Sequence, residues 1–97
     1  MAKHYNITKK NIWAHELIGL KARVIESTDK GRVGIQGVII DETKNTIVLE
    51  SANKIKVLPK KEVVLEVELE SGKVILDCKR IMFRPEDRIK VFWRKAL

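Results

Sequence analysis

The chain has 97 residues and a formal net charge of +7, and it is 44% hydrophobic and 34% charged. These values indicate one globular domain with a modest core, and they exclude a disordered chain. No apolar run reaches the roughly 20 residues of a membrane span, and the first residues lack the apolar centre of a signal peptide, so we expect a cytoplasmic protein.

Few residues in the chain have side chains that bind transition metals. Cys78 is the only cysteine, and His4 and His15 are the only histidines. One cysteine excludes an internal disulfide, and the histidines give no zinc-ligand spacing. We therefore expect no metal or other cofactor to be bound by this chain.

The excess of positive charge is concentrated at the two ends of the chain. Residues 1–23 carry a net charge of +4 and residues 79–97 carry +5, whereas residues 24–78 carry −2. Segregated positive charge attracts phosphates through counterion release, which favours nucleic acid as the partner. The alternative is an ordinary lysine-rich solvated surface, such as heat-adapted proteins have.

A first helix is predicted over residues 8–18, with Thr8 as its cap and Gly19 as its stop. Its apolar positions have helical spacing: Ile12, Trp13 and Leu17. Residues 20–24 then alternate between apolar and basic side chains, which is the period of a half-buried strand.

Residues 33–50 predict a β-hairpin. β-Branched residues flank a polar corner at residues 41–45, so we expect two antiparallel strands joined by a five-residue loop. Gly34 and Gly37 lie in the first strand, where glycine indicates a sharp bend or a close approach to another backbone. Such a bend would help to curl a small sheet into a barrel.

Three further strands are predicted after the hairpin. Residues 54–57 alternate up to Pro59, which ends that strand or marks it as an edge. Residues 63–70 alternate strictly and return through a Ser71-Gly72 turn to a strand over residues 74–76.

A second helix is predicted over residues 85–95. Pro85 stands early in it, and Glu86 and Asp87 occupy its first turn, as is typical of a helix N-terminus. Its apolar stripe consists of Ile89, Phe92 and Trp93. Six short strands between two terminal helices predict an all-β domain with a small barrel over residues 19–83.

The residue patterns of common catalytic sites are missing from the chain. Asp41 and Glu42 are adjacent carboxylates, but neighbouring strand-end side chains point apart, so we interpret them as a solvated hairpin corner. His15 has no nucleophile close to it in sequence, and there is no nucleophile-elbow, Walker or dinucleotide motif. We therefore predict no catalytic residues in this chain.

Basic residues are concentrated where the last strand passes into the second helix, with two more after Pro59. The predicted RNA contacts are Lys60, Lys61, Lys79, Arg80, Arg84 and Arg88. Their spacing suits successive phosphates, although Arg88 has a local ion pair with Glu86 or Asp87 as an alternative. Because few aromatic residues are available for base stacking, we expect recognition of RNA shape and backbone.

Three of the five aromatic residues lie in the predicted terminal helices. A small barrel has limited area to cover two amphipathic helices, and tryptophan is a common interface anchor. The predicted surface for a protein partner consists of Ile12, Trp13, Leu17, Ile89, Phe92 and Trp93. Packing of these side chains on the barrel is the alternative.

Four motifs occur in one order within residues 8–90. They are His15-Glu16-Leu17-Ile18-Gly19, Gly34-Ile35-Gln36-Gly37, Asp41-Glu42-Thr43-Lys44-Asn45-Thr46 and Arg84-Pro85-Glu86-Asp87-Arg88. In this order they resemble the archaeal ribonuclease P protein component 1 family, relatives of the eukaryotic Pop-type subunit. The resemblance implies a six-stranded Sm-like (SH3-like) barrel flanked by N- and C-terminal helices.

The resemblance further implies a protein subunit of ribonuclease P, the ribonucleoprotein that removes 5′ leaders from precursor tRNA. In that enzyme the RNA carries the magnesium chemistry, so no cofactor is expected on this chain. The implied partners are the ribonuclease P RNA, precursor tRNA in the holoenzyme and a zinc-ribbon protein subunit that forms a heterodimer with this one. The alternatives are a ribosomal or Sm-type RNA-binding protein and a stand-alone nuclease that uses Asp41, Glu42 and Asp77.

Overall fold

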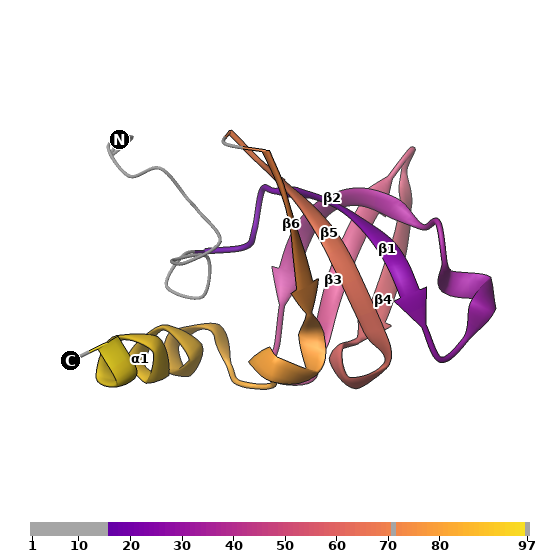
Figure 1. Ribbon diagram of the computed structural model, residues 1–97. Helices are drawn as coiled ribbons and strands as arrows, with labels where there is room; N and C mark the ends of the chain where they lie inside the picture. Colours follow the sequence, from indigo (N-terminus) through magenta and orange to yellow (C-terminus); the bar gives the residue numbers. More distant parts are fainter. Residues whose placement is uncertain (1–15, 71, 97) are drawn as a thin grey trace.

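In the part of the chain that the structure describes, six antiparallel strands form one sheet, and a helix follows it (Figure 1). The structure is a computed structural model that describes residues 16–70 and 72–96, with the backbone alone for residues 91–96. The strands are β1 Lys21–Ser27, β2 Gln36–Glu42, β3 Thr46–Ser51, β4 Lys54–Pro59, β5 Val63–Leu69 and β6 Gly72–Asp77. Within these described residues, the helical elements are the short 3-10 turns η2 Lys30–Arg32, η3 Lys60–Glu62 and η4 Cys78–Ile81, and the helix α1 Pro85–Ala96.

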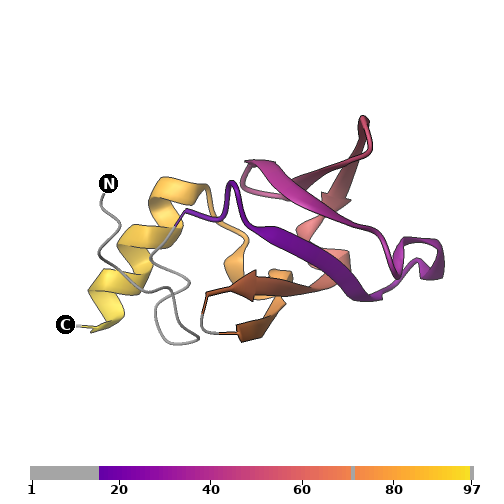
Figure 2. The ribbon, with the colours of Figure 1, turned by 90° about the horizontal axis from the view of Figure 1, so that it is seen from above.

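The order of the strands in the sheet is β4-β3-β2-β1-β5-β6, so β4 and β6 are its two edges. The view from above shows that the sheet is strongly curved (Figure 2). It is not closed, because β4 and β6 are not paired with each other in the part of the chain that the structure describes. The predicted all-β fold is therefore confirmed as a six-stranded sheet, and the closed barrel over residues 19–83 is not confirmed.

Two irregularities help to bend the sheet. The register between β1 and β5 shifts between Val24 and Glu26, and the register between β2 and β3 shifts between Ile39 and Asp41. A bulge of this kind leaves one residue unpaired and increases the local twist of its strand. The curvature therefore arises within the two strands that lie in the middle of the sheet.

Gly37 in β2 lies where two backbones come close together. A Cβ atom at this position would lie 2.9 Å from the carbonyl carbon of Glu50 and closer still to its oxygen. The predicted close approach is therefore confirmed for Gly37. Gly34 precedes β2 instead of lying in it, and its φ of +95° serves the turn that leads into the strand.

One face of the sheet carries the hydrophobic core. The strict alternation of β5 has the predicted effect, because Val63, Leu65 and Val67 are all buried. The alternation of β4 does not, since Ile55 and Val57 are 59% and 60% exposed. This edge strand is exposed from Lys54 to Val57 and enters the core only at Leu58.

The predicted C-terminal helix over residues 85–95 is confirmed as α1, which extends away from one side of the sheet (Figures 1 and 2). The predicted N-terminal helix over residues 8–18 lies mostly outside the described residues. The part inside them, residues 16–18, is not helical, and Ile18 and Gly19 form a turn. Among the described helices, none has the length and apolar character needed to span a membrane.

Candidate nucleic-acid interface

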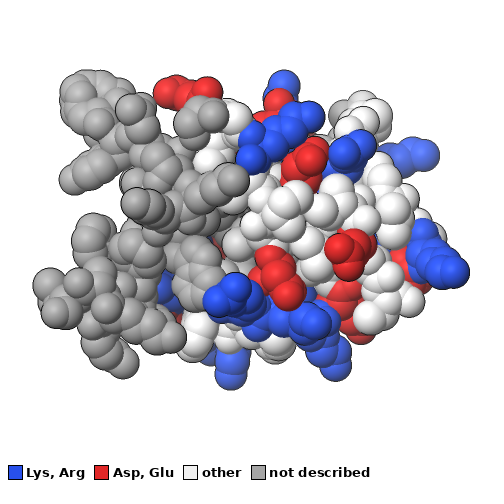
Figure 3. Space-filling view, viewed as in Figure 1, with Lys and Arg blue, Asp and Glu red and all other residues white. Residues whose placement is uncertain are grey.

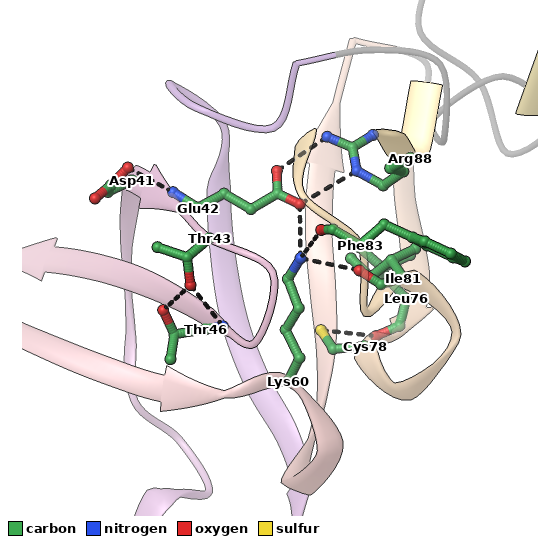
Figure 4. A network of polar contacts seen from close by, with 10 residues as sticks. All are labelled: Asp41, Glu42, Thr43, Thr46, Lys60, Leu76, Cys78, Ile81, Phe83 and Arg88. Atoms are coloured by element: carbon green, nitrogen blue, oxygen red, sulfur yellow. Dashed lines mark hydrogen bonds and ion pairs between the residues drawn. The ribbon is translucent and has the colours of Figure 1, made fainter. Parts of the chain in front are cut away.

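A buried ion network joins the end of β2 to the first turns of α1 (Figure 4). Glu42 is the last residue of β2, and its carboxylate is completely buried. Lys60 Nζ lies 2.9 Å from Oε2 of Glu42, and Arg88 Nη2 lies 2.9 Å from Oε1. Arg88 Nε also donates to Oε2 over 3.2 Å, so both carboxylate oxygens are bound by cations.

Lys60 connects this network to the segment that leads into α1. Its Nζ also donates to the carbonyl oxygens of Ile81 and Phe83, at 2.9 and 3.0 Å. With Glu42 as the third acceptor, all three hydrogens of the ammonium group have a partner. Burial lowers the pKa of Lys60, and the hydrogen bond that Lys60 donates to Glu42 opposes that shift.

Lys60 and Arg88 were predicted as RNA contacts, and the structure corrects that prediction. Their exposed fractions are 0% and 1%, and their charged groups face Glu42 inside the protein. A phosphate on the surface cannot reach either group in this conformation. The local pairing of Arg88 with Glu86 or Asp87 is replaced by the pair with Glu42, from 46 residues away in sequence.

Glu42 also differs from its predicted place in a solvated corner. Asp41 is exposed and Glu42 is buried, so the two carboxylates do point apart, and Asp41 Oδ1 accepts a hydrogen bond from the Glu42 amide over 2.9 Å.

Asp77, the third carboxylate of the nuclease alternative, caps η4 by accepting a hydrogen bond from the amide of Lys79. Within residues 16–70 and 72–96, no group of three or more His, Cys, Asp or Glu residues could hold a metal ion.

The remaining predicted RNA contacts are exposed: Lys61, Lys79, Arg80 and Arg84. The turns η3 and η4 pack against each other, which brings Lys61 close to the segment of Lys79 and Arg80. Figure 3 shows Lys and Arg side chains along the lower edge of the molecule, where Figure 1 places η4 and the β4–β5 connection. Residues that are distant in sequence thus share one basic edge.

Lys61 and Lys79 line a depression of about 420 Å³ together with Lys30. Acidic residues also line it, and one of them, Glu62, is bound by Arg32 at 2.6 Å and by Thr28 at 3.2 Å. The Arg32 guanidinium, followed by the Thr28 hydroxyl, holds the pKa of the Glu62 carboxyl below its usual value. The charge of Glu62 is therefore already engaged within the protein.

Arg84 lies apart from that depression, beside the corner of the β2–β3 hairpin. Lys30 and Lys44, which line the two depressions, were not among the predicted RNA contacts. Both belong to residues 24–78, which have a net charge of −2 although they include exposed lysines. Only the position of each residue in the fold shows that they lie beside the predicted contacts.

The predicted surface for a protein partner is partly corrected. Leu17 is 1% exposed and belongs to the hydrophobic core, so it is not available to a partner. Ile89 is half-buried on α1. Ile12 and Trp13 lie outside the described residues, and the side chains of Phe92 and Trp93 lie outside them as well.

Comparison with known proteins identifies the family. The family model for ribonuclease P/MRP subunit p29 matches residues 10–91. Ribonuclease P protein component 1 of Pyrococcus furiosus is 47% identical over 90 residues, which are 92% of this chain and 71% of that protein. The protein of the same name from Methanosphaera stadtmanae is 48% identical over 85 residues, 87% of this chain and 91% of that protein.

A solved structure shares the fold. The structure of Mth11, described as a homologue of human RNase P protein Rpp29, matches with a TM-score of 0.57 and 36% sequence identity. The match covers 77% of this chain and 99% of that chain. Sequence and fold therefore agree, and the chain belongs to the ribonuclease P/MRP subunit p29 family.

Proposed function

We propose that this chain is an RNA-binding protein subunit of ribonuclease P and is not itself catalytic. The observation that carries the proposal is the family match over residues 10–91, together with two relatives named ribonuclease P protein component 1 at 47% and 48% identity. In this proposal the RNA subunit supplies the magnesium chemistry that cleaves the 5′ leader of precursor tRNA. The protein contributes by binding and shaping that RNA.

The exposed cations support RNA binding through the phosphate backbone. Lys61, Lys79, Arg80 and Arg84 are exposed, and the chain as a whole carries a charge of +7. Contacts of this kind fix an RNA in place without reading its bases. We further propose that the curved sheet corresponds to an Sm-like (SH3-like) barrel that acts as the platform for these residues.

The state of Glu42 argues against the alternative of a stand-alone nuclease. Both of its carboxylate oxygens are held by Lys60 and Arg88, so it is not available to bind a metal ion or to move a proton. Asp77 is likewise engaged in capping η4. The nuclease alternative depended on these two residues and Asp41.

The cleavage assay that tests the proposal uses the full chain and precursor tRNA in magnesium. The purified chain alone should leave the substrate intact, and addition of the ribonuclease P RNA with its other protein subunits should give cleavage at the 5′ leader. Robust cleavage by the chain without any RNA subunit would overturn the proposal.

We also propose that the chain forms a heterodimer with a zinc-ribbon protein subunit through α1. The resemblance implies this partner, and the half-buried Ile89 gives α1 an apolar residue for the contact. Light scattering of the chain with that subunit should give the mass of a one-to-one pair. A six- or seven-fold particle of the chain alone would instead support the Sm-type alternative.

A further inference from the structure

The corner of the β2–β3 hairpin and the start of α1 enclose a depression of about 480 Å³. Residues from both segments line it: Glu42, Thr43, Lys44, Asn45, Arg84, Pro85 and Glu86. The hairpin corner had no role in the proposed RNA surface. Its position beside Arg84 suggests that it also contacts RNA.

The walls of this depression are held together by the ion network. The amide of Lys60 donates to the carbonyl oxygen of Asn45 over 2.8 Å, and its Nζ donates to the carbonyl oxygen of Phe83. A single lysine thus binds the hairpin corner on one side and the residue before Arg84 on the other. Because Lys60 is fully buried and makes both hydrogen bonds, it connects the two walls from inside the protein.

The corner itself is closed by short hydrogen bonds. The amide of Thr43 donates to the carbonyl oxygen of Thr46 over 2.9 Å, and the two threonine hydroxyls lie 2.6 Å apart (Figure 4). Lys44 lies between these residues at the tip of the hairpin. A constrained tip presents its side chain from a defined position, which reduces the entropy lost on binding.

The charges around the depression suit an anion. Lys44 and Arg84 are exposed and come from the two different segments, and neither forms an ion pair within the described residues. Of the two carboxylates among the described residues that line the depression, Glu42 is already bound by Lys60 and Arg88, and Glu86 is exposed. Two exposed cations from different segments that line one polar depression match one phosphodiester group.

We propose that this depression binds a backbone phosphate of RNA between Lys44 and Arg84. Lys44 then becomes an RNA-binding residue, and the hairpin corner becomes part of the RNA surface. The proposal rests on the proposed function, since it requires that the chain binds RNA. An acidic protein segment is the other class of anionic ligand, and it is an outcome of the test.

The test compares Lys44→Gln with Lys54→Gln in the full chain. Lys54 is an exposed lysine at the opposite end of the β3–β4 ladder, so its loss changes the net charge equally. The binding constant for the ribonuclease P RNA is measured at several salt concentrations for each variant. Lys44→Gln should lower the slope of log K against log salt by about one phosphate contact, and Lys54→Gln should leave it unchanged.

The outcomes separate this proposal from the proposed function. If wild type binds the RNA and both variants keep its slope, the phosphate site is wrong and the function stands. If wild type does not bind the RNA, the function itself fails. If Lys44→Gln weakens binding to a protein subunit and not to RNA, the ligand is an acidic protein segment and the RNA site is overturned.

A second measurement locates the contact directly. Lys44→Cys and Lys54→Cys are labelled with a tethered iron reagent that cleaves nearby RNA. The buried thiol of Cys78, whose pKa is raised to about 12, should not take the label. Cuts from position 44 should cluster in one region of the ribonuclease P RNA and be missing from position 54, and a lack of cuts from position 44 would overturn the site.

Discussion

Glu42 and Arg88 form a bidentate ion pair in the protein interior, with Nη2 at 2.9 Å from Oε1 and Nε at 3.2 Å from Oε2. The pair connects the last residue of β2 to the first turns of α1. Transfer of ions out of water costs several kcal/mol each, so such a pair is tolerated only when its hydrogen bonds are complete. Lys60 binds the same carboxylate and two backbone carbonyls, and the network has this completeness.

Substitution of Glu42 should therefore be strongly destabilising. In Glu42→Gln, a neutral amide replaces the carboxylate and leaves two buried cations without their counter-charge, which should cost about 3–5 kcal/mol of unfolding free energy. Urea denaturation measures the loss. The exposed Glu70→Gln is the matched control and should change stability by less than about 0.5 kcal/mol. Equal stability of the two variants would show that the network contributes little.

The sequence predicted the elements whose signals are local. The strict alternation of β5 marks the residues that are buried, and the early proline with acids after it marks the start of α1. Gly37 was assigned a close backbone approach for the right reason, since glycine is required where a Cβ does not fit. In each case the deciding information lies within a few residues.

The roles of Lys60 and Arg88 were not predictable in this way. A basic residue has the same local sequence whether it faces solvent or a carboxylate from another strand, and Glu42 lies 18 and 46 residues away from the two. The same limit applies to β4. The alternation of apolar and basic residues in this strand does not reveal that its side chains enter the core only at Leu58. Long-range packing decides these positions, and a single sequence does not contain it.

Lys60 and Lys61 are adjacent in sequence, but they should respond to substitution in opposite ways. Lys60→Met removes the donor to Glu42, Ile81 and Phe83. It should cost about 2–4 kcal/mol of unfolding free energy, because the carbonyl oxygens of Ile81 and Phe83 lose this donor, while Arg88 still binds both oxygens of Glu42. Lys61→Met should change stability by less than about 0.5 kcal/mol, since Lys61 is exposed.

RNA binding by these two variants is measured at a temperature where both are folded. Lys61→Met should lower the salt dependence of RNA binding by about one phosphate contact, whereas Lys60→Met should retain most of it. A normal salt slope in Lys61→Met would remove this residue from the RNA surface. Wild-type stability in Lys60→Met would contradict its structural role.

Gly37 and Gly34 should differ in how they tolerate alanine. Gly37→Ala places a methyl group against the backbone of Glu50, which is held in the β2–β3 ladder, so we expect a loss of about 3 kcal/mol or more. Gly34→Ala meets no atom within 4 Å, and its cost comes only from the positive φ, about 1–2 kcal/mol. Thermal denaturation of both variants gives the order, and a larger loss for Gly34→Ala would contradict the close approach.

Cys78 should remain a protonated thiol throughout the physiological pH range. The side chain is fully buried, Sγ donates to the carbonyl oxygen of Leu76 over 3.7 Å, and burial raises the pKa of the thiol from 9.0 to about 12. Folding thus favours the protonated form. The stabilisation that results is fully present below pH 9, and it is lost as the pH rises from there towards about 12.

The measurement is the unfolding free energy of wild type and Cys78→Ala between pH 8 and pH 11. Burial lowers the pKa of Lys60, so any contribution of Lys60 to the pH dependence has the opposite sign and is common to both proteins. The difference in unfolding free energy between wild type and Cys78→Ala therefore isolates the contribution of the thiol to the pH dependence. Above pH 9, wild type should lose up to about 1.4 kcal/mol more per pH unit than the variant, and parallel curves would show that the thiol ionises freely in the folded protein.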